Sequence, residues 1–333
     1  MSVIHDKPGR AALHLARAAS LAPSPHNCQP WFFVEEGDDR GFEVHLDDGR
    51  RMVLTDPYGR EAVIACGAAL FNVRIAVRHL GFRPVVDLLP DPGDSHHLAR
   101  VGYAAHAPST PDEALLVRGM NSRYTHRGRF GAAPVPDELL ADLHEQARVE
   151  GATLQIVDDP EQLALLAGLV RTAEDTHRAD LGHATELARC VGPYGMPVEA
   201  CRHHPDTTLL AGREYLPRAG RRRVSARSRT AGTGTVVILS TPHDRRTDWL
   251  RSGQALQRML LHAAAHDVMA AFHTQPLELP ALRARLRTDV TAGRYPQIVL
   301  RLGQVPQRPA WCTPRRPPVQ VLARDDAPAR WSP

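Results

Sequence analysis

The sequence predicts a fold of mixed helices and strands in which one arrangement of elements occurs twice along the chain. With 333 residues, of which 43% are hydrophobic, the chain can bury the core of one large domain or of two small ones. Two long, mostly apolar helices are expected over residues 61–82 and 252–272, and helix and strand units precede each of them. The two helices open with the same pattern, which is Gly67-x-Ala69-Leu70 in the first and Gly253-x-Ala255-Leu256 in the second. This repetition indicates an internal duplication.

The elements of the first half follow from apolar periodicity and turn residues. A helix is expected over 8–21, and it ends at the Pro- and Asn-containing loop 22–30. Trp31–Val34 predicts a strand, and a second strand is expected around Phe42–Leu46. The helix 61–82 is apolar on nearly every side, which is typical of a helix in the middle of a core.

A linker is expected at 105–114, and a similar order of elements follows it. The segment 134–147 predicts a helix, with Pro136 near its start and acidic residues in its first turn. The segments 152–157 and 235–239 predict strands. The long apolar helix 252–272 then occupies the place that 61–82 has in the first half.

The second half contains an insertion, roughly 160–232, that the first half lacks. It begins as an amphipathic helix around Leu163–Val170 and continues as sequence rich in Gly, Pro, His and Arg. Segments of this length inside a compact domain are usually lids, binding loops or disordered stretches. We therefore divide the chain into a half at 1–112 and a half at 113–333 that carries the insertion.

Composition excludes several classes of partner. The formal net charge is +4, and the one dense basic run, Arg218–Arg229, has no interleaved aromatic residues, so no nucleic-acid partner is expected. Arg or His interrupts every apolar run before it reaches the length of a membrane helix, and the N-terminus has no apolar signal region, so no membrane partner is expected. The five cysteines are widely spaced and form no CxxC pair, which favours reduced thiols and a cytoplasmic location.

The loop Ala22-Pro-Ser-Pro-His-Asn-Cys-Gln-Pro-Trp31 is the most informative stretch of the sequence. A proline-rich turn at the end of a helix frees the side chains of Ser24 and Asn27 to hydrogen-bond a polar planar ring. The alternative is a rigid turn between helix and strand in which Asn27 satisfies its own backbone.

A second informative stretch is Arg123-Tyr-Thr-His-Arg127. Two guanidinium groups and the hydroxyl of Thr125 can give a phosphate several charge-assisted hydrogen bonds. The alternative for so short a pattern is a solvated basic end of a strand.

Taken together, several segments resemble the nitroreductase-like FMN flavoproteins. The loop 22–31 is similar to the PSxxNxQPW loop of that family, and 123–127 followed by Pro134-Val-Pro136 is similar to its RxSxR opening. The segment 313–319 is similar to the closing RxP segment of the family. Residues 275–280 stand where the family has the loop beside N5 of the flavin. The resemblance implies FMN as the cofactor.

The resemblance also implies which residues contact the flavin, and an arginine of the closing segment is among them. Arg316 is the better match for this arginine, and Arg315 is the alternative. Gln275 replaces the acidic residue that the family usually has beside N5. This departure argues against ordinary NAD(P)H-dependent turnover. No catalytic side chain is expected, because the flavin carries the chemistry. The implied cofactor-binding residues are Pro23, Ser24, His26, Asn27, Arg123, Thr125, Arg127, Gln275, Pro276, Leu277, Arg315 and Arg316.

These segments are divided between the two halves. Ordinary nitroreductases are dimers in which each flavin site combines segments of both subunits. Here the first half has the PSxxN loop, and the second half has the RxSxR opening, the loop beside N5 and the closing arginine. The resemblance therefore implies a fused pseudo-dimer, monomeric in solution, with one FMN site between its halves. With the insertion, this arrangement resembles the Acg branch, in which the insertion is thought to cover the flavin as a lid.

The fold that the resemblance implies is α+β, a nitroreductase fold with two antiparallel sheets flanked by helices. The implied function is an FMN oxidoreductase that transfers hydride through N5 between a small-molecule electron donor and a small organic acceptor. The alternative is a flavin-sequestering protein with a closed lid and little NAD(P)H turnover. A catalytically silent interaction protein is a third possibility, against which the FMN-binding residues argue.

The histidine-rich segments do not predict a metal site. His262 and His266 have the spacing of a zinc motif but lack its glutamate, so we interpret them as packing or surface residues of a helix. Cys201, His203, His204 and Asp206 lie close in sequence, but adjacent residues point in different directions. The sequence also lacks the glycine patterns of Rossmann and P-loop nucleotide sites.

Overall fold

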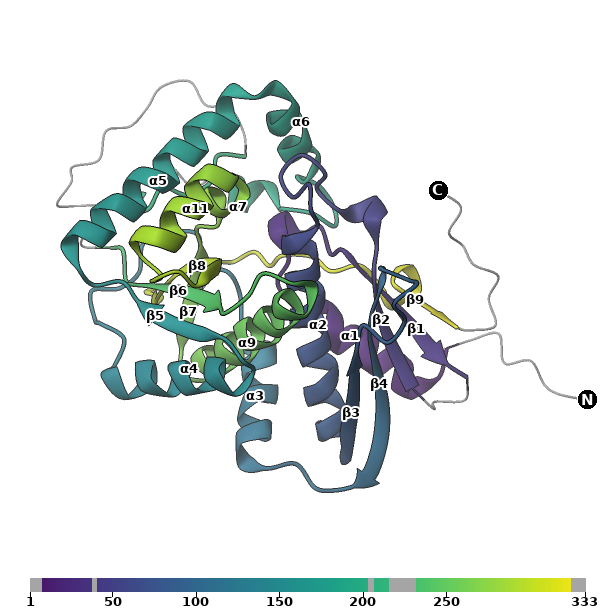
Figure 1. Cartoon of the computed structure of the whole chain (residues 1–333). Helices are drawn as coiled ribbons and strands as arrows, with labels where there is room; N and C mark the ends of the chain where they lie inside the picture. Colours follow the sequence, from purple (N-terminus) through teal and green to yellow (C-terminus); the bar gives the residue numbers. More distant parts are fainter. Residues whose placement is uncertain (1–7, 38–40, 203–206, 216–231, 325–333) are drawn as a thin grey trace, which may run out of the picture.

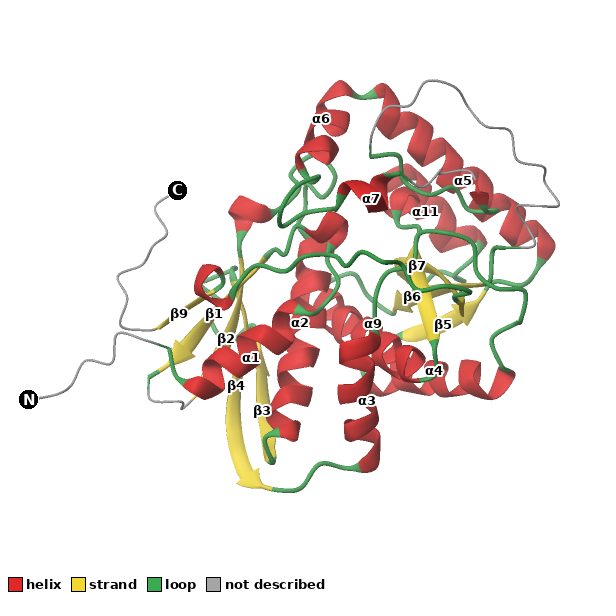
Figure 2. Cartoon of the chain, turned by 180° about the vertical axis from the view of Figure 1, so that it is seen from behind, coloured by secondary structure: helices red, strands yellow, loops and turns green. Residues whose placement is uncertain are grey.

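The computed structural model describes residues 8–37, 41–202, 207–215 and 232–324. Two sheets lie at opposite sides of the molecule, and the long helices α2 (Arg60–His79) and α9 (Arg246–Ala265) cross between them (Figure 1). The α+β class predicted from the sequence is confirmed. Figure 2 shows from behind that helices cover both sheets.

The sheet of the first half has the strand order β3-β4-β2-β1-β9; α2 packs against it, and α1 packs against α2. Its neighbours are antiparallel except for β1 and β9, which run parallel with Phe33 opposite Leu322. This parallel pair departs from the antiparallel sheets that the sequence predicts, because β9 enters from the C-terminal end of the chain (Figure 1). The bounds are α1 Arg10–Ser20, β1 Trp31–Glu36, β2 Gly41–Leu46, β3 Phe82–Leu88, β4 His97–His106 and β9 Leu322–Arg324.

The sheet of the second half is antiparallel throughout, in the order β5-β6-β8-β7. The described part of the insertion forms α5, α6 and α7, of which α5 packs against α10 and α11. The bounds are α3 Pro111–Ser122, α4 Asp137–Val149, β5 Thr153–Ile156, α5 Pro160–Ala179, α6 Leu181–Arg189, α7 Val198–Cys201, β6 Thr235–Thr241, β7 Val268–Phe272, α10 Gln275–Glu278, α11 Pro280–Asp289 and β8 Tyr295–Gln304.

Two sequence predictions about these elements are wrong. The expected linker 105–114 is mostly ordered structure, because β4 continues to His106 and α3 begins at Pro111, where Thr110 caps it. The half boundary at 112/113 therefore falls in the first turn of α3. The expected helix 252–272 is in fact α9 followed by β7, with Asp267 at a positive φ of 59° between them. The apolar run Val268–Phe272 fits a buried helix and a buried strand equally well by periodicity.

The two central helices meet at the glycines of the repeated pattern. A Cβ atom at Gly67 would overlap the carbonyl group of Leu250 on α9, and one at Gly253 would overlap the carbonyl group of Ile64 on α2. A Cβ at Gly253 would also lie 2.9 Å from the Cα of Gly67. Each helix therefore places its glycine against the backbone of the other, which a residue without a side chain permits. The shared pattern marks this reciprocal contact.

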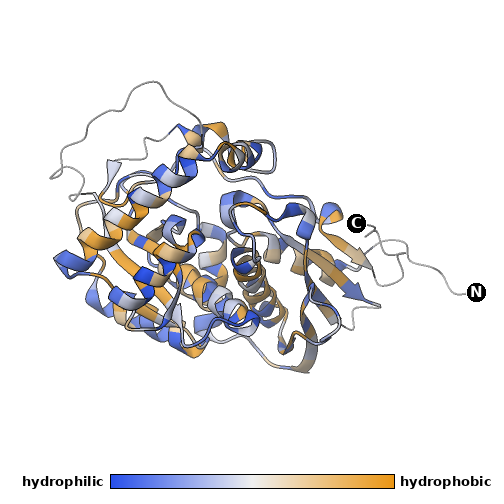
Figure 3. Cartoon of the chain, turned by 45° about the horizontal axis from the view of Figure 1, so that its top comes forward, coloured by the Kyte–Doolittle hydropathy of each residue, from blue (hydrophilic) through white to orange (hydrophobic). Residues whose placement is uncertain are grey.

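Helix α2 is buried along nearly its whole length. Among the described helices it alone is long and apolar enough to cross a membrane, and 83% of that apolar window is buried inside the protein. In Figure 3 the hydrophobic colour gathers on the interior helices and strands, whereas helices at the rim alternate between the two colours. This burial is what the sequence predicts for a helix in the middle of a core.

Candidate functional site

A cavity opens between the two halves of the chain. It encloses about 1120 Å³ of empty space, part of it open to solvent. Its wall combines the loop 23–26 and α2 from the first half, residues 125–127 and 271–275 from the second half, and insertion residues between 200 and 215. Of the twelve residues predicted to bind the cofactor, the cavity wall contains Pro23, Ser24, His26, Thr125, Arg127 and Gln275.

The loop before β1 holds a strained backbone conformation. His26, Asn27 and Gln29 have positive φ angles of 48°, 59° and 53°. For residues that carry a Cβ, each such conformation costs on the order of 1–3 kcal/mol and persists only where surrounding contacts hold it. One such contact lies within the loop, where the Ser24 hydroxyl accepts a hydrogen bond of 3.0 Å from the Gln29 amide.

Asn27 joins this loop to two distant segments. Its Nδ2 donates to the carbonyls of Tyr194 and Pro314, each at 2.8 Å, and to that of Gly195 at 3.0 Å. Its Oδ1 accepts a bond of 2.9 Å from Arg315. The alternative in which Asn27 satisfies its own backbone is therefore wrong. Asn27 lies behind the cavity wall, where it connects the loop to the insertion and to the C-terminal segment.

Three arginines gather beside the loop. Arg123 and Arg315 both donate a hydrogen bond to the carbonyl of Leu21, at 2.9 and 3.4 Å. Arg127 lines the cavity and donates to the carbonyl of Thr125. Within the described part of the chain, none of the three pairs with a carboxylate. Burial, together with the charges of Arg315 and Arg127, lowers the pKa of Arg123 to about 9. Because buried charges are normally paired, this cluster is suited to an anion.

The two candidate arginines of the closing segment point to different places. Burial lowers the pKa of Arg315 to about 10, and its Nε is buried without a hydrogen-bond partner. Arg316 points elsewhere: its guanidinium donates to Gln320 and stands 5.2 Å from the centre of the Tyr194 ring, and its Nε is likewise buried without a hydrogen-bond partner. The sequence match favours Arg316, but Arg315 is the arginine that joins Arg123. Adjacent residues of an extended segment face opposite ways, which explains the difference.

The loop predicted to lie beside the flavin ring forms the short helix α10. Gln275 is 1% exposed, lines the cavity and donates to the carbonyl of Ala211 at 3.3 Å. Pro276 and Leu277 are buried but do not line this cavity, because Leu277 packs into the apolar cluster beside α5. Of these three residues, Gln275 alone has its side chain at the cavity.

Arg301 and His273 form a buried polar pair in the cavity wall. The Nε of Arg301 donates to His273 Nε2 at 2.7 Å, so the ring proton is on Nδ1, which donates to the carbonyl of Ala211 at 3.0 Å. Another guanidinium nitrogen of Arg301 donates to the carbonyl of Thr233 at 2.8 Å. Burial lowers the pKa of Arg301 to about 9 and that of His273 well below its usual range. The wall here presents a cation beside a neutral imidazole.

A second group of buried charges stands on the insertion side of the cavity. Arg213 lines the cavity, forms an ion pair with Glu278 and lies 3.5 Å from His177 Nδ1. The rings of His177 and His183 stack with centroids 4.0 Å apart. Burial, Arg213 and His183 lower the pKa of His177 to about 3, so this histidine is neutral at pH 7.

Glu61 supplies a carboxyl group to the cavity wall from the start of α2. It is 5% exposed and accepts a hydrogen bond of 2.9 Å from Arg60. Burial and the neighbouring charge of Glu278 raise its pKa to about 8, although Arg60 acts in the opposite direction. A carboxyl group whose pKa is raised in this direction, in a cavity wall, can act as a general acid.

Sequence reasoning missed Glu61, Arg213, His273 and Arg301. A signal was present for two of them, because Glu61 opens an apolar helix and Arg301 interrupts the apolar strand β8. A charge inside a run that is expected to be buried requires a partner or a function. Arg213 and His273 lie in segments without such a pattern.

His262 and His266, which were set aside in the sequence, are not among the residues that line the cavity. His262 and His266 pack on α9 with ring centroids 4.8 Å apart, and His266 Nδ1 lies 3.0 Å from the carbonyl of His262. Cys201 is buried at the end of α7. His203, His204 and Asp206 fall outside the described residues, as does the basic run Arg218–Arg229.

Comparisons with known proteins identify relatives along nearly the whole chain, although no family model matches it. A Mycobacterium tuberculosis protein named "Putative NAD(P)H nitroreductase" is 32% identical over 311 residues, which span 91% of this chain and 88% of the relative. A second protein of that organism, with the same name followed by acg, is 28% identical over 313 residues, which span 91% of this chain and 92% of the relative. A solved structure of a nitroreductase named NfnB from Mycobacterium smegmatis covers 58% of this chain and 88% of its own, at a TM-score of 0.36 and 15% identity. Because the first relative is so similar over nearly all of both chains, this chain belongs to the nitroreductase family.

Proposed function

We propose that this protein is an FMN-binding oxidoreductase of the cytoplasm that transfers two electrons from a small-molecule donor to a small organic acceptor. The observation that carries the proposal is the cluster of Arg123, Arg127 and Arg315, which lies beside a cavity between the halves without a carboxylate partner among the described residues. The names of the relatives support the redox chemistry. All five cysteines are free, which suits a reducing compartment.

The residues present fit FMN at its charged end. A phosphate group would supply the negative charge that the arginine cluster lacks, and the buried Nε of Arg315 is a donor without a partner. The Thr125 hydroxyl lies in the cavity wall next to Arg127 and can add a neutral hydrogen bond. When bound, FMN supplies the hydride chemistry at N5, while the protein orients it and tunes its potential.

Other residues of the cavity wall fit a polar planar ring. Ser24 and His26 approach from the first half, and Gln275 and Arg301 approach from the second half. Burial lowers the pKa of His26 well below its usual range, and its Nδ1 lies 2.9 Å from the Tyr215 hydroxyl. Because the His26 imidazole is neutral, it adds no further charge to the part of the cavity that would hold the flavin ring.

Glu61 is the residue that we assign to proton supply. Its pKa is raised by burial, its side chain is 5% exposed, and it lines the cavity. Two-electron reduction of an organic acceptor consumes protons, and a carboxyl group of raised pKa can deliver one. In this proposal Glu61, from the first half, supplies the proton that the amide of Gln275 cannot supply.

We also propose that the chain is an internal pseudo-dimer, monomeric in solution, of halves at 1–112 and 113–333. The reciprocal contact of Gly67 and Gly253 and the contribution of both halves to one cavity support this. One arginine cluster accompanies the cavity in the described part of the chain. The expected stoichiometry is therefore one FMN per chain.

The insertion is proposed to act as a lid over this cavity. In its described part, the Glu186 carboxylate accepts hydrogen bonds from the amides of Leu54 and Thr55, each at 2.9 Å, and from the Thr55 hydroxyl at 2.7 Å. Tyr215 contacts His26 at the cavity wall. These contacts attach the insertion to the first half.

The experiment that tests the proposal is a titration of the purified full chain with FMN. The absorbance spectrum and the flavin-to-protein ratio at saturation are measured, and NADPH or NADH is then added without oxygen. We expect a ratio of one and bleaching of the flavin band. A protein that cannot be loaded with FMN would refute the cofactor, and a ratio of two would refute the single site. Tight binding without reduction would favour flavin sequestration.

A further inference from the structure

A group of two histidines and a glutamate lies on the sheet of the first half, away from the cavity. Glu43 and His45 are two residues apart on β2, so their side chains share one face of the sheet. His97, the first residue of β4, is the direct cross-strand partner of His45. The alternate residues of β2, Val44 and Leu46, are buried in the core, so the three polar residues occupy the opposite face. The sheet itself therefore brings them together.

The three side chains converge through their nitrogen and oxygen atoms. His45 Nε2 lies 2.7 Å from one carboxylate oxygen of Glu43, and His97 Nε2 lies 3.6 Å from the other. One donor atom of each residue lies within 4.8 Å of those of the other two. The imidazole rings stack with centroids 4.4 Å apart, and His97 Nε2 is buried without a hydrogen-bond partner. The side chains are 14–20% exposed, so the group is partly shielded yet reachable.

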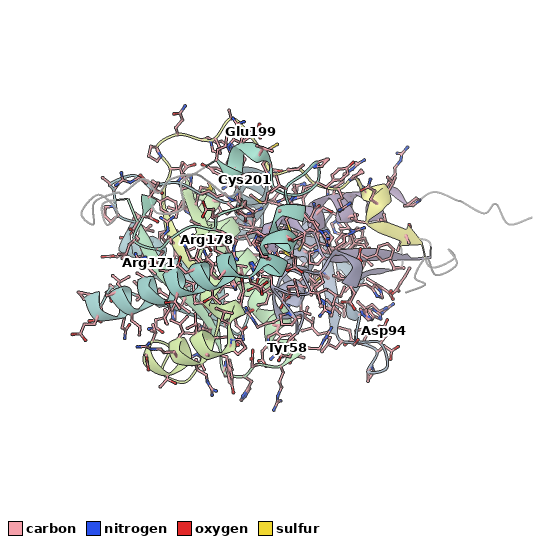
Figure 4. All side chains as sticks on the ribbon, turned by 90° about the horizontal axis from the view of Figure 1, so that it is seen from above. Tyr58, Asp94, Arg171, Arg178, Glu199 and Cys201 are labelled. Carbon is pink, nitrogen blue, oxygen red and sulfur yellow. The ribbon has the colours of Figure 1, made fainter. Side chains whose placement is uncertain are left out.

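The charges around this group favour a cation. Asp94 and Asp91 lie on the turn before β4 and act electrostatically on His97, and Figure 4 labels Asp94 at the surface at this end of the molecule. Arg100, the cross-strand partner of Glu43, forms its ion pair with Glu36, although its charge also acts on Glu43. His96 on the same turn is engaged by Asp48 at 2.8 Å.

A second group of two histidines and one glutamate differs, because a positively charged side chain lies among its members. His177, His183 and Glu278 also bring their donor atoms within 4.8 Å. However, Arg213 forms an ion pair with Glu278 and lies 3.5 Å from His177 Nδ1, so a cation already stands among these residues. The group on the sheet has no such guanidinium in contact with its ligand atoms among the described residues.

We propose that Glu43, His45 and His97 bind a divalent transition-metal ion, with Zn²⁺ as the best match, through the two Nε2 atoms and the carboxylate. Two imidazoles and one carboxylate are a common zinc ligand set, and water can take the remaining position. Metal bonds of 2.0–2.2 Å in a tetrahedron place ligand atoms roughly 3.3 Å apart, close to the spacing of Glu43 with both histidines.

The ion would join β2 to β4 where their pairing is irregular. The register shifts between Val44 and His45, so backbone hydrogen bonding is interrupted beside the proposed site. A metal bound across the two strands adds a link at that point. The proposed role is therefore structural, and it does not depend on the proposed flavin chemistry because none of the three residues lines the cavity.

The test measures Zn²⁺ binding to the full chain after treatment with a chelator. Affinity is measured by competition with a chromophoric chelator, and Co²⁺ is used as a spectroscopic probe of imidazole and carboxylate coordination. The variants are His45→Gln and His97→Gln, since glutamine keeps a donor for Glu43 but removes the imidazole ligand. His144→Gln on the exposed face of α4 is the matched control. Circular dichroism and thermal unfolding in the presence of chelator check that each variant is folded.

We expect one high-affinity Zn²⁺ per chain, and a rise in Tm of the wild type on Zn²⁺ addition. In each ligand variant the Zn²⁺ affinity should fall by roughly 100-fold or more, which exceeds the usual effect of changing a residue that only contacts a metal ligand. Each variant should also lose the rise in Tm. His144→Gln should keep both. Should a variant fail to fold, the Co²⁺ spectrum of the wild type still decides the matter, because absent or purely hexa-aqua-like absorption overturns the site. Equal binding in the wild type and both ligand variants, or an equal loss in His144→Gln, also overturns it.

Discussion

Replacing Arg315 by alanine should weaken FMN binding far more than replacing its neighbour Arg316. Arg315 is half-buried among neutral acceptors, and its pKa of about 10, against 12.5 in water, corresponds to about 3 kcal/mol against the charged form. Because the folded-state pKa lies below the usual value, this cost is present at neutral pH and disappears only in strong alkali. A phosphate in contact with the guanidinium offsets the cost. A charge-assisted hydrogen bond at a desolvated position contributes about 2–3 kcal/mol, so the Kd should rise roughly 30- to 150-fold.

The assay is fluorescence quenching of FMN and of riboflavin by the flavin-free protein at fixed ionic strength. Arg316→Ala is the matched control, because Arg316 is adjacent in the chain but contacts Gln320 and the Tyr194 ring. We expect a loss of less than threefold for this control. Riboflavin lacks the phosphate and should bind the wild type and both variants with similar, weaker affinity. Equal losses for the two variants, or equal losses for FMN and riboflavin, would refute a phosphate site built on Arg315.

Three further predictions follow from packing, titration and the insertion. Gly253→Ala should lower the free energy of unfolding by about 2–3 kcal/mol in chemical denaturation, because its Cβ meets the backbone of α2. Gly168→Ala on α5 should be neutral or stabilising, because a Cβ there meets no atom within 4 Å. Because the folded-state pKa of Glu61 is raised to about 8, its contribution to wild-type stability should fall as pH rises from about 5 to 8, by at most about 1.4 kcal/mol per pH unit. Glu61→Gln should remove this part of the pH dependence, and parallel curves for the two proteins would contradict the assignment. Glu186→Ala removes three hydrogen bonds between the insertion and the first half, and it should speed dithionite reduction of bound FMN by up to roughly 10- to 100-fold. Glu199→Ala, at an exposed site labelled in Figure 4, should leave that rate unchanged, and equal rates for both variants would argue against a lid.

The sequence predicts the architecture because its strongest signals are local. The all-round apolarity of α2 indicates a central helix, and the shared glycine pattern of α2 and α9 lies at the contact that the two helices make. The prediction fails where the pattern allows two structures. Val268–Phe272 is apolar in a helix and in a strand alike, and the left-handed conformation of Asp267 that separates them has no glycine to reveal it.

The candidate site is predicted less completely, since it depends on which way neighbouring side chains face. The motif places two arginines at positions 315 and 316, and only the path of the segment shows that Arg315 joins Arg123. Likewise, the motif identifies Gln275 as part of the cavity but includes Pro276 and Leu277, which the short helix α10 turns into the core. A sequence motif identifies a segment, and backbone geometry selects the residues within it.

The contacts of Asn27 explain why such a site escapes prediction from one segment at a time. Its amide bonds the insertion at Tyr194 and the C-terminal segment at Pro314, which lie 167 and 287 residues away along the chain. The strained backbone of His26 and Asn27 persists only where those contacts exist, and the same contacts bring Arg315 to Asn27 and Leu21. The loop, the insertion and the C-terminal segment therefore stabilise one another. Asn27→Ala should consequently perturb the arginine cluster and weaken FMN more than riboflavin, although Asn27 itself does not line the cavity.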